Sequence, residues 1–211
     1  MRDWSIVVPL KRLHAAKSRL RGAVPGVAHD DLVLALALDT VQAALRCPVV
    51  RAVYVVTDEI RTQNAVSALG AHWIRDAPDA GLNPALTHGA AHVARSAPDT
   101  GVATLGGDLP ALRPEELAEA LTMAMAHERA YVPDAPGSGT VLLTARPGVT
   151  LDPRFGPDSA REHARSGAYL LDGVWPSLRR DVDVREDLVT AAHLGLGSHT
   201  SALLATAAIH L

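Results

Sequence analysis

The chain contains few of the residues on which several large classes of protein depend. Its single cysteine, Cys47, excludes an intrachain disulfide and a metal site built from several cysteines. Aromatic residues make up only 3% of the sequence, so the hydrophobic core must consist mainly of Ala, Val and Leu. No apolar run approaches the ~18–20 residues of a transmembrane helix, and no signal peptide precedes the first apolar segment. We therefore expect a cytoplasmic protein that does not bind a membrane.

The chain also has no excess of positively charged residues over negatively charged ones. The formal net charge is −3, whereas proteins that bind nucleic acid usually carry a broad surface of Lys and Arg, so nucleic acid is not an expected partner. Hydrophobic residues make up 48% and charged residues 20% of the chain, which is typical of a globular protein with a substantial core. The length of 211 residues predicts a single domain, 1–211, with residues 195–211 as a helical appendage.

Short apolar runs alternate along the chain with longer segments whose apolar residues have helical spacing. Strands are expected at residues 5–8, 52–57, 72–75, 101–105, 130–133 and 140–144. Helices are expected at about residues 30–45, 59–69, 84–96, from 114 onward, at 159–163, at 185–194 and in the tail. Strands that alternate with helices form right-handed βαβ units. The pattern therefore predicts a three-layer α/β fold around a mainly parallel sheet.

The two lysines of the chain lie close together. Of its 20 Lys and Arg residues only Lys11 and Lys17 are lysines, and both follow the first expected strand. The lysine ammonium is a compact point charge, whereas the arginine guanidinium is a planar fork. Two such charges beyond the carboxyl end of a strand favour a phosphate-binding loop, to which Arg12, Arg19 and Arg21 add positive charge. The alternative is that both lysines are ordinary solvated side chains.

Two acidic segments are candidates for a metal site. Asp108 ends an expected strand and follows Gly106-Gly107, which allow a ligand to approach closely. A carboxylate there suits Mg²⁺, which takes one or two carboxylates together with water and phosphate oxygens. Asp183 is the second candidate ligand, since Asp181 and Asp183 alternate along an extended segment and share one face. Asp108 could instead serve a turn or helix cap, and Asp181 or Asp183 could cap the following helix.

Two histidine motifs suggest other chemistry. His88 and His92 stand four residues apart on an expected helix, as two zinc ligands can, but the Glu of a metalloprotease helix and an evident third ligand are missing. Ser159 and His163 have the same spacing without the strand–turn elbow that exposes a nucleophile. We therefore expect neither zinc-dependent hydrolysis nor acyl transfer.

Six segments carry a family resemblance when they are taken in order. They are Val-Pro-Leu-Lys-Arg-Leu…Ala-Lys-Ser-Arg-Leu, Asp-Ala-Gly-Leu-Asn-Pro-Ala-Leu, Gly-Asp-Leu-Pro-Ala-Leu, Gly-Ser-Gly-Thr, Phe-Gly-Pro-Asp-Ser…His and Asp-Val-Asp…Glu-Asp-Leu. Together they resemble the 2-phospho-L-lactate or phosphoenolpyruvate guanylyltransferases of coenzyme F-420 biosynthesis, over residues 6–188. The resemblance implies the nucleotide-diphospho-sugar transferase fold, which is GT-A-like and Rossmann-like.

The resemblance also implies an activity and a set of site residues. GMP would pass from GTP to the phosphate of phosphoenolpyruvate or 2-phospho-L-lactate, with release of pyrophosphate and with Mg²⁺ held by Asp108 and Asp183. Lys11, Lys17 and Asp108 would be catalytic. The nucleotide would contact Pro9, Leu10, Lys11, Lys17, Arg19, Gly81 and Asn83. The phosphorylated acid would contact Thr140, Gly156 and Ser159.

Several features of this hypothesis stay open at the level of the sequence. The Ala- and Arg-rich composition favours phosphoenolpyruvate as the acceptor, with 2-phospho-L-lactate and 3-phosphoglycerate as alternatives. A homodimer and direct transfer of a labile product to the next enzyme are compatible with the resemblance. Another nucleotidyltransferase of the same fold, acting on molybdopterin or a sugar phosphate, usually has a Gly-rich loop where this chain has Pro9-Leu10-Lys11-Arg12. A non-catalytic nucleotide-binding subunit is the remaining alternative, although the lysines and aspartates argue against it.

Overall fold

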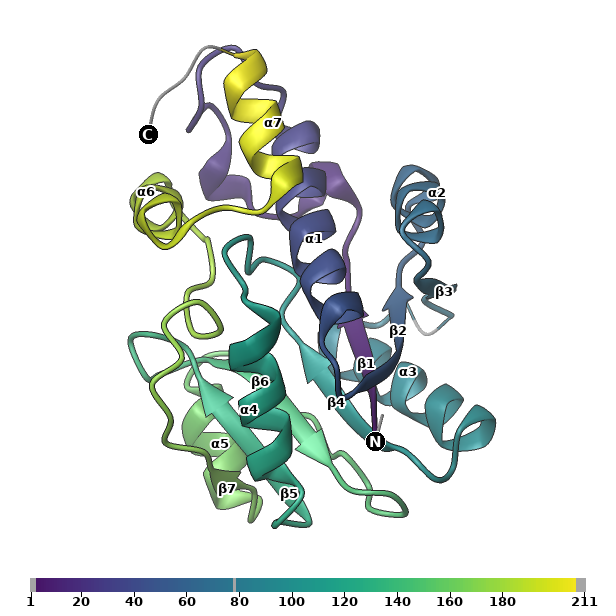
Figure 1. The fold of residues 1–211 in the computed structure, drawn as a ribbon. Helices are drawn as coiled ribbons and strands as arrows, with labels where there is room; N and C mark the ends of the chain where they lie inside the picture. The colour runs from purple at the N-terminus through teal and green to yellow at the C-terminus, as the bar shows by residue number, and fades with distance from the viewer. Residues whose placement is uncertain (1–2, 78, 208–211) are drawn as a thin grey trace.

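The computed structural model describes residues 3–77 and 79–207, which form a sheet between layers of helices (Figure 1). The strands are β1 Trp4–Pro9, β2 Val50–Val56, β3 His72–Ile74, β4 Gly101–Leu105, β5 Arg129–Pro133, β6 Thr140–Ala145 and β7 Tyr169–Leu170. The helices are α1 His29–Arg46, α2 Ile60–Ala68, α3 Leu82–Ser96, α4 Pro114–Ala124, α5 Ser159–Arg165, α6 Arg185–Leu194 and α7 Ser198–Thr206. Each expected strand and helix is present, whereas the two-residue β7 and two short 3-10 turns, Leu13–Ala15 and Ser18–Leu20, were not predicted.

The sheet is mainly parallel, as expected. Its strand order is β3-β2-β1-β4-β6-β5-β7, and only β6 runs antiparallel to its neighbours among the described strands. The chain moves outward from β1 to β2 and β3, and then returns to place β4 on the other side of β1. This reversal lies between β1 and β4. In open α/β sheets the connections diverge at such a point and leave a crevice beyond the carboxyl ends of the strands.

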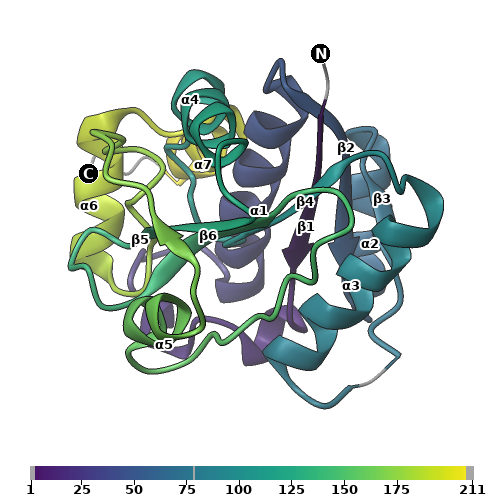
Figure 2. The ribbon, with the colours of Figure 1, turned by 90° about the horizontal axis from the view of Figure 1, so that it is seen from below.

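Helices cover both faces of the sheet. Successive side chains of a strand point to opposite faces, so Ile6 and Val8 of β1 lie in a cluster with α1 and α4, while Val7 lies in a second cluster with α3. Figure 2 shows α4 on one side of the sheet and α5 on the other. The first five residues of β1 are buried, as is typical of a parallel strand covered on both faces. The three-layer prediction is confirmed.

The C-terminal helix is attached by buried contacts. α7 packs against α1, and its Leu204 lies in a hydrophobic cluster with residues of α1 and α6. The buried carboxylate of Asp39 in α1 accepts hydrogen bonds from the amides of His199 and Thr200, both at 2.8 Å. The expected helix in the tail is therefore present, and α1 supplies the acceptor for its first turn. Residues 208–211 of the expected appendage lie outside the described residues. None of the described helices combines the length and the apolar character needed to cross a bilayer.

Asp39→Ala is expected to lower the free energy of unfolding by about 1–3 kcal/mol, because two amides of α7 lose a buried charged acceptor. Equilibrium unfolding in urea measures this loss. Asp99→Ala is the control, because Asp99 is exposed and pairs with the exposed Arg51, so its loss should cost less than about 1 kcal/mol. Equal losses in the two variants would contradict the role of Asp39.

Candidate active site

A cavity of about 1050 Å³ lies at the carboxyl ends of β1 and β4, where the strand order reverses. Its wall combines residues of the loop after β1, the loop after β4 and the segment before α6. The residues singled out in the sequence that line it include Pro9, Leu10, Lys11, Lys17, Arg19, Gly81, Asp108, Thr140, Asp181 and Asp183. The fold therefore gathers most of the candidates for nucleotide and metal binding around one space.

Three aspartates converge at this cavity. Carboxylate oxygens of Asp108, Asp181 and Asp183 lie within 4.8 Å of one another, although these residues are far apart in the sequence. The amide of Val182 donates a hydrogen bond to the carbonyl of Asp108 at 3.0 Å, and the Val182 side chain is buried in the hydrophobic core. Because side chains alternate along an extended segment, burial of Val182 directs both flanking aspartates away from the core. The backbone contact and the buried valine thus bring the acidic cluster together.

Asp183 could have served as the cap of α6, but Asp187 performs that role instead. The carboxylate of Asp187 accepts hydrogen bonds from the amides of Asp183 and Val184, at 3.0 and 3.1 Å. These bonds satisfy donors at the start of α6. The carboxylate of Asp183 therefore remains in the acidic cluster, as does that of Asp108, whose side chain contacts Lys17.

Lys17 lies between two of the aspartates. Its ammonium donates hydrogen bonds to the carboxylates of Asp108 and Asp183, and its side chain is only 17% exposed. Burial alone would lower the pKa of Lys17, but the charge and hydrogen bonds of the two carboxylates outweigh it and raise this pKa. Lys17 is thus a permanent cation, and its left-handed backbone (φ 50°, ψ 45°) is uncommon for a residue other than glycine. Non-glycine residues held in this region often lie at functional sites.

One lysine does not balance the charge of three carboxylates. Burial raises the pKa of Asp181 to about 7, with further contributions from the negative charges of Asp108 and Asp183 and an opposing one from Lys17. An additional cation would relieve this repulsion. Carboxylate oxygens are also the ligands that Mg²⁺ prefers. The donor set and its excess negative charge therefore fit a divalent cation.

The other lysine has different surroundings. Lys11 lines the cavity, and it forms no ion pair with an acid in the part of the chain that the structure describes. Its neighbour Arg12 instead pairs with Asp58 and Asp79, at 3.9 and 3.8 Å. Lys11 and Lys17 thus both border the cavity, but only the charge of Lys17 is compensated by the acidic cluster. The charge of Lys11 is free to attract an anion.

The residues predicted to bind the acceptor lie together, but not all of them face the cavity. Thr140, at the start of β6, lines it, whereas Gly156 and Ser159 do not. The buried Ser159 donates a hydrogen bond from its hydroxyl to Thr140 Oγ1 at 3.3 Å, and its amide donates to the carbonyl of Gly156 at 3.2 Å. Thr140 is therefore the member of this group placed to touch a ligand, and Ser159 and Gly156 lie immediately behind it. Their assignment as acceptor contacts stays a prediction.

Asn83 also lies behind the cavity wall, where its side chain holds the backbone of Phe155. Its side-chain amide donates to the carbonyl of Phe155 at 2.9 Å, and its side-chain oxygen accepts from the Phe155 amide at 2.8 Å. This pair of bonds joins the start of α3 to the loop that precedes α5. Asn83 does not line the cavity, while Gly81 and Phe155 do. A direct contact of Asn83 with the nucleotide stays a prediction, and its visible role is to fix this part of the wall.

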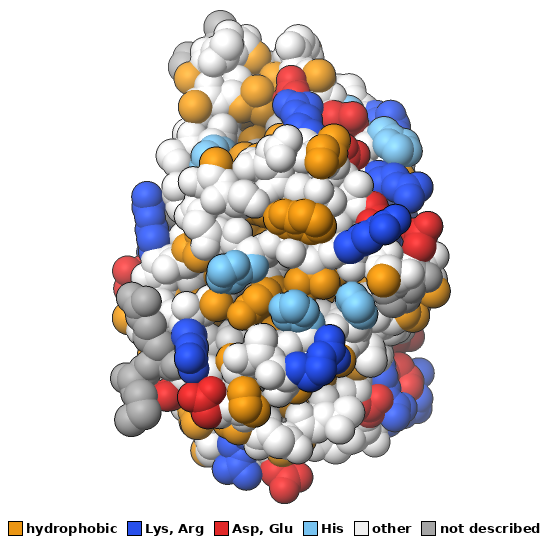
Figure 3. All heavy atoms as spheres, turned by 90° about the vertical axis from the view of Figure 1, so that its right-hand side faces the viewer, with side chains coloured by type: hydrophobic (Ala, Val, Ile, Leu, Met, Phe, Trp, Pro, Cys, Tyr) orange, Lys and Arg blue, Asp and Glu red, His pale blue; other side chains and the backbone are white. Residues whose placement is uncertain are grey.

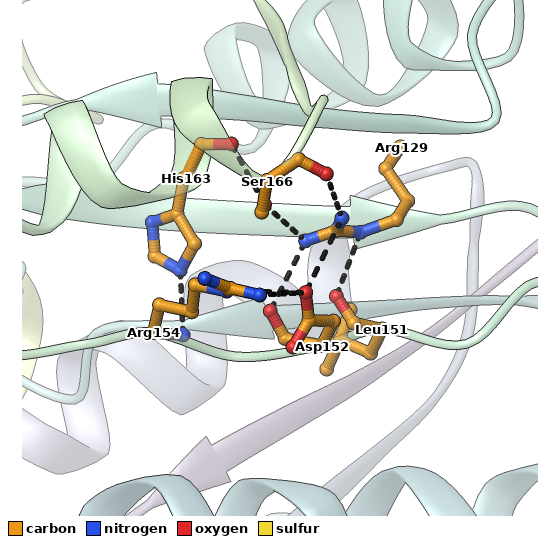
Figure 4. Close-up of polar contacts among 6 residues, drawn as sticks. All are labelled: Arg129, Leu151, Asp152, Arg154, His163 and Ser166. Atoms are coloured by element: carbon orange, nitrogen blue, oxygen red, sulfur yellow. Dashed lines mark hydrogen bonds and ion pairs between the residues drawn. The ribbon is translucent and has the colours of Figure 1, made fainter.

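His163 is a polar residue of this region to which we assigned no role from the sequence. Its ring is fully buried, with Nδ1 2.9 Å from Thr140 Oγ1, and Nε2 accepts the amide N–H of Arg154 at 2.9 Å (Figure 4). Burial lowers the pKa of His163 to about 4, helped by the positive charges of Arg129 and Arg154 and opposed by Asp152. The imidazole is therefore neutral at pH 7. The sequence signal at His163 was its place at the end of the Phe-Gly-Pro-Asp-Ser…His segment, which did not reveal these contacts.

Acid is expected to destabilise the protein through His163. In the unfolded chain the imidazole takes up a proton near pH 6.5, whereas in the folded protein it stays neutral down to about pH 4. The unfolded state thus binds more protons in this window, and stability falls as the pH decreases from about 6.5 to about 4, by up to about 3 kcal/mol. Urea unfolding at a series of pH values measures this loss.

His163→Gln removes the titrating ring and should make stability less dependent on pH between about 6.5 and 4. His193→Gln, at an exposed position of α6, is the matched control and should retain the dependence of the wild type. The same pH dependence in His163→Gln and wild type would show that His163 does not cause the loss.

The zinc alternative is not supported. Within residues 3–77 and 79–207, the one group of three or more side chains that could share a metal ion is the acidic cluster, and it contains neither His88 nor His92. His92 and His72 instead lie beside the ring of Tyr54, with ring centroids 5.6 and 5.1 Å away. Figure 3 shows histidine side chains among hydrophobic ones on the face that carries β3 and α3.

The fold is shared with known nucleotidyltransferases. A family model described as the MobA-like NTP transferase domain matches residues 20–164. The structure resembles a putative nucleotide-diphospho-sugar transferase from Desulfovibrio desulfuricans G20, with a TM-score of 0.68 and 15% identity over 98% of this chain and 95% of that one. It also resembles a nucleotidyl transferase from Methanothermobacter, with a TM-score of 0.62 and 20% identity over 92% and 98% of the two chains. The class of protein is therefore an NTP transferase with the nucleotide-diphospho-sugar transferase fold, as expected.

Closer relatives narrow this class. A protein of Salinispora arenicola is 56% identical over 97% of this chain and 95% of its own, and one of Streptomyces coelicolor is 50% identical over 96% of each. Both are named phosphoenolpyruvate guanylyltransferase. The chain belongs to the phosphoenolpyruvate guanylyltransferase family, which confirms the resemblance inferred from its motifs.

Proposed function

We propose that this protein transfers GMP from GTP to the phosphate of phosphoenolpyruvate in coenzyme F-420 biosynthesis, in a reaction that depends on Mg²⁺. The observation that carries this proposal is the convergence of Asp108, Asp181 and Asp183 with Lys17 at the edge of a cavity. Membership in the family supplies the substrates. The cavity supplies a place where two anionic reactants can meet.

The reaction needs no general base from the protein. The phosphate of the acceptor carries close to two negative charges at neutral pH, so one of its oxygens is already a nucleophile. That oxygen forms a bond to the α-phosphorus of GTP, the bond from this phosphorus to the bridging α–β oxygen breaks, and pyrophosphate leaves. The protein therefore has to align the reactants and balance their charge.

The cavity residues divide these tasks. Asp108 and Asp183, with Asp181 beside them, are the residues that would hold Mg²⁺, which when bound neutralises charge on phosphate oxygens. Lys11 provides an uncompensated positive charge on the cavity wall, and Lys17 a second one beside the carboxylates. Both are placed to balance the charge that develops on the departing pyrophosphate.

The remaining wall suits a small anionic acceptor. Thr140 offers a hydroxyl to the cavity, with Ser159 and Gly156 behind it. The competing acids differ from phosphoenolpyruvate by a few atoms, and a pocket distinguishes such differences by only about 1–3 kcal/mol unless it forms specific hydrogen bonds. The choice of acceptor is therefore the part of the proposal that most needs a direct assay.

A screen of pyrophosphate release tests the proposed function. Phosphoenolpyruvate, 2-phospho-L-lactate and 3-phosphoglycerate are each combined with each of the four nucleoside triphosphates, with and without Mg²⁺. Release should be fastest with GTP, phosphoenolpyruvate and Mg²⁺ together. Faster release with another acid would reassign the acceptor, and no release with any pair would overturn the proposal.

Ser159→Ala is expected to raise the KM for the acceptor by about three- to tenfold, because Thr140 loses the hydrogen bond that Ser159 donates to it behind the cavity wall, with a smaller change in the KM for GTP. Steady-state kinetics with each substrate varied in turn measure both values. Ser201→Ala, an exposed serine of α7, is the control for loss of a hydroxyl. A larger change in the KM for GTP than in the KM for the acceptor would show that Ser159 does not belong to the acceptor site.

A further inference from the structure

His163 joins the acceptor wall to the loop behind it. Its Nδ1 faces the hydroxyl of Thr140, which lines the cavity, and its Nε2 faces the amide of Arg154. The ring itself does not line the cavity and packs edge-on against Phe155, with centroids 4.9 Å apart. His163 is thus one side chain removed from a bound ligand.

The partners of His163 determine where its proton lies. A backbone N–H can only donate, so the amide of Arg154 requires a lone pair on Nε2. The neutral ring then carries its proton on Nδ1, and this N–H donates to Thr140 Oγ1. The contacts therefore fix one tautomer of the ring.

The same reasoning places the hydroxyl proton of Thr140. Its oxygen accepts from His163 Nδ1–H and from the hydroxyl of Ser159, and these two bonds use both of its lone pairs. Among the residues that the structure describes, Thr140 Oγ1 has no further hydrogen-bond partner. The hydroxyl proton of Thr140 is therefore left available to a ligand in the cavity that Thr140 lines.

The surroundings of His163 are held by Arg129, whose side chain is only 11% exposed. Its guanidinium donates to the carbonyls of Leu151, Asp152 and Ser166, at 2.9 to 3.0 Å (Figure 4). These bonds join the loop that carries the Arg154 amide to the end of α5, the helix that carries His163. Arg129 therefore fixes both sides of the contact with Nε2.

We propose that His163 is a positioning residue that orients the Thr140 hydroxyl as a donor to an anionic oxygen of the acceptor. The inference deepens the proposed function and rests on it. A donor that is already available to the ligand does not have to reorient when the ligand binds, and such preorganisation increases affinity. His163 also prevents Thr140 from turning its proton toward Nδ1, because that nitrogen is itself a donor.

Two substitutions separate this role from a structural one. In His163→Asn, the amide nitrogen can replace Nδ1 as a donor to Thr140, but the acceptor for the Arg154 amide is lost. In His163→Gln, the amide oxygen can replace Nε2 as that acceptor, but the donor to Thr140 is lost. A positioning role makes Gln the more harmful change for acceptor binding, whereas a purely structural role makes Asn the more harmful one.

The test measures the KM for phosphoenolpyruvate, the KM for GTP and the Tm of both variants, alone and combined with Thr140→Val. His163→Gln should raise the KM for phosphoenolpyruvate about tenfold, which corresponds to about 1.4 kcal/mol, and leave the KM for GTP within about twofold of wild type. His163→Asn should have the smaller effect. In the Thr140→Val background, His163→Gln should cause no further rise, since the hydroxyl that it orients is gone.

An equal effect of His163→Gln with and without the Thr140 hydroxyl, or a larger effect of Asn than of Gln on the KM for phosphoenolpyruvate, would overturn the inference. If the wild type shows no guanylyl transfer, the proposed function fails instead, and NMR of the ring nitrogens of His163 still tests the geometry. A proton on Nδ1 at pH 7 is the expected result. A proton on Nε2 would overturn the inference whatever the activity of the protein.

Discussion

Asp108→Asn should lower the rate of guanylyl transfer by at least about a thousandfold, because the acidic cluster loses the carboxylate that meets both Lys17 and the segment from Asp181 to Asp183. The fold should persist. Asp108 contributes to the raised pKa of Asp181, so a neutral amide in its place relieves repulsion within the acidic cluster. Turnover with GTP and phosphoenolpyruvate, together with circular dichroism and thermal unfolding, measures both outcomes.

The matched control for this substitution is Asp99→Asn. Asp99 also pairs with a cation, Arg51, but both side chains are at least half exposed, so this variant should retain the activity of the wild type. A rate near that of the wild type in Asp108→Asn would remove Asp108 from the catalytic site. Unfolding of Asp108→Asn would instead assign it a structural role.

Lys17→Ala is expected to reduce kcat/KM for GTP by about 10²- to 10³-fold, because the proposed mechanism loses a partly buried cation that balances charge on the departing pyrophosphate. The effect on stability should be small when Mg²⁺ is present. Lys17 balances the charge of Asp108 and Asp183 in the structure, and a divalent cation can take over that task. Kinetics with varied GTP and Tm with and without Mg²⁺ measure the two effects separately.

Arg51→Ala serves as the control for the loss of a cation from an ion pair, because Arg51 lies on the surface away from the cavity. It should change neither the GTP kinetics nor the response of Tm to Mg²⁺. Unchanged GTP kinetics in Lys17→Ala would show that the loop after β1 does not act on the nucleotide. A large fall in Tm that Mg²⁺ does not reverse would assign Lys17 a structural role instead.

Local pattern was sufficient to predict most of the fold. The β-branched run around Val53 to Val56 and the acids at the start of α1 predicted their elements, because burial on both faces and the helix dipole act over a few residues. The two-residue β7 escaped prediction, since so short a strand leaves no recognisable periodicity. Its pairing with β5 depends on the fold as a whole.

The candidate site could be predicted only in part, because its key contacts join distant segments. Residue type and position indicated Lys17 as a phosphate-binding residue, and Asp108 and Asp183 as metal ligands, each considered separately. Nothing in the sequence indicated that Lys17 would lie between the two aspartates, because this requires the Val182 backbone contact with Asp108.

The roles of Asp187 and His163 were also not predicted, because they too depend on contacts formed only in the folded chain. Asp187 was not predicted as the residue that caps α6, although a carboxylate in the first turn of a helix is a common acceptor for its amides. His163 was considered only as a partner of Ser159 in acyl transfer, which the lack of a nucleophile elbow argued against, and it received no other role. Its bonds to Thr140 and Arg154 exist only when three segments meet.

The most direct test is a crystal structure grown with Mn²⁺, phosphoenolpyruvate and a GTP analogue that cannot transfer its nucleotide. Anomalous scattering should locate one ion within coordination distance of the carboxylates of Asp108 and Asp183, with oxygens of both reactants bound to the same ion. Lys17 should then lie beside the phosphates of the nucleotide. An ion bound elsewhere, or carboxylates that still contact only Lys17 while both reactants are present, would contradict the account.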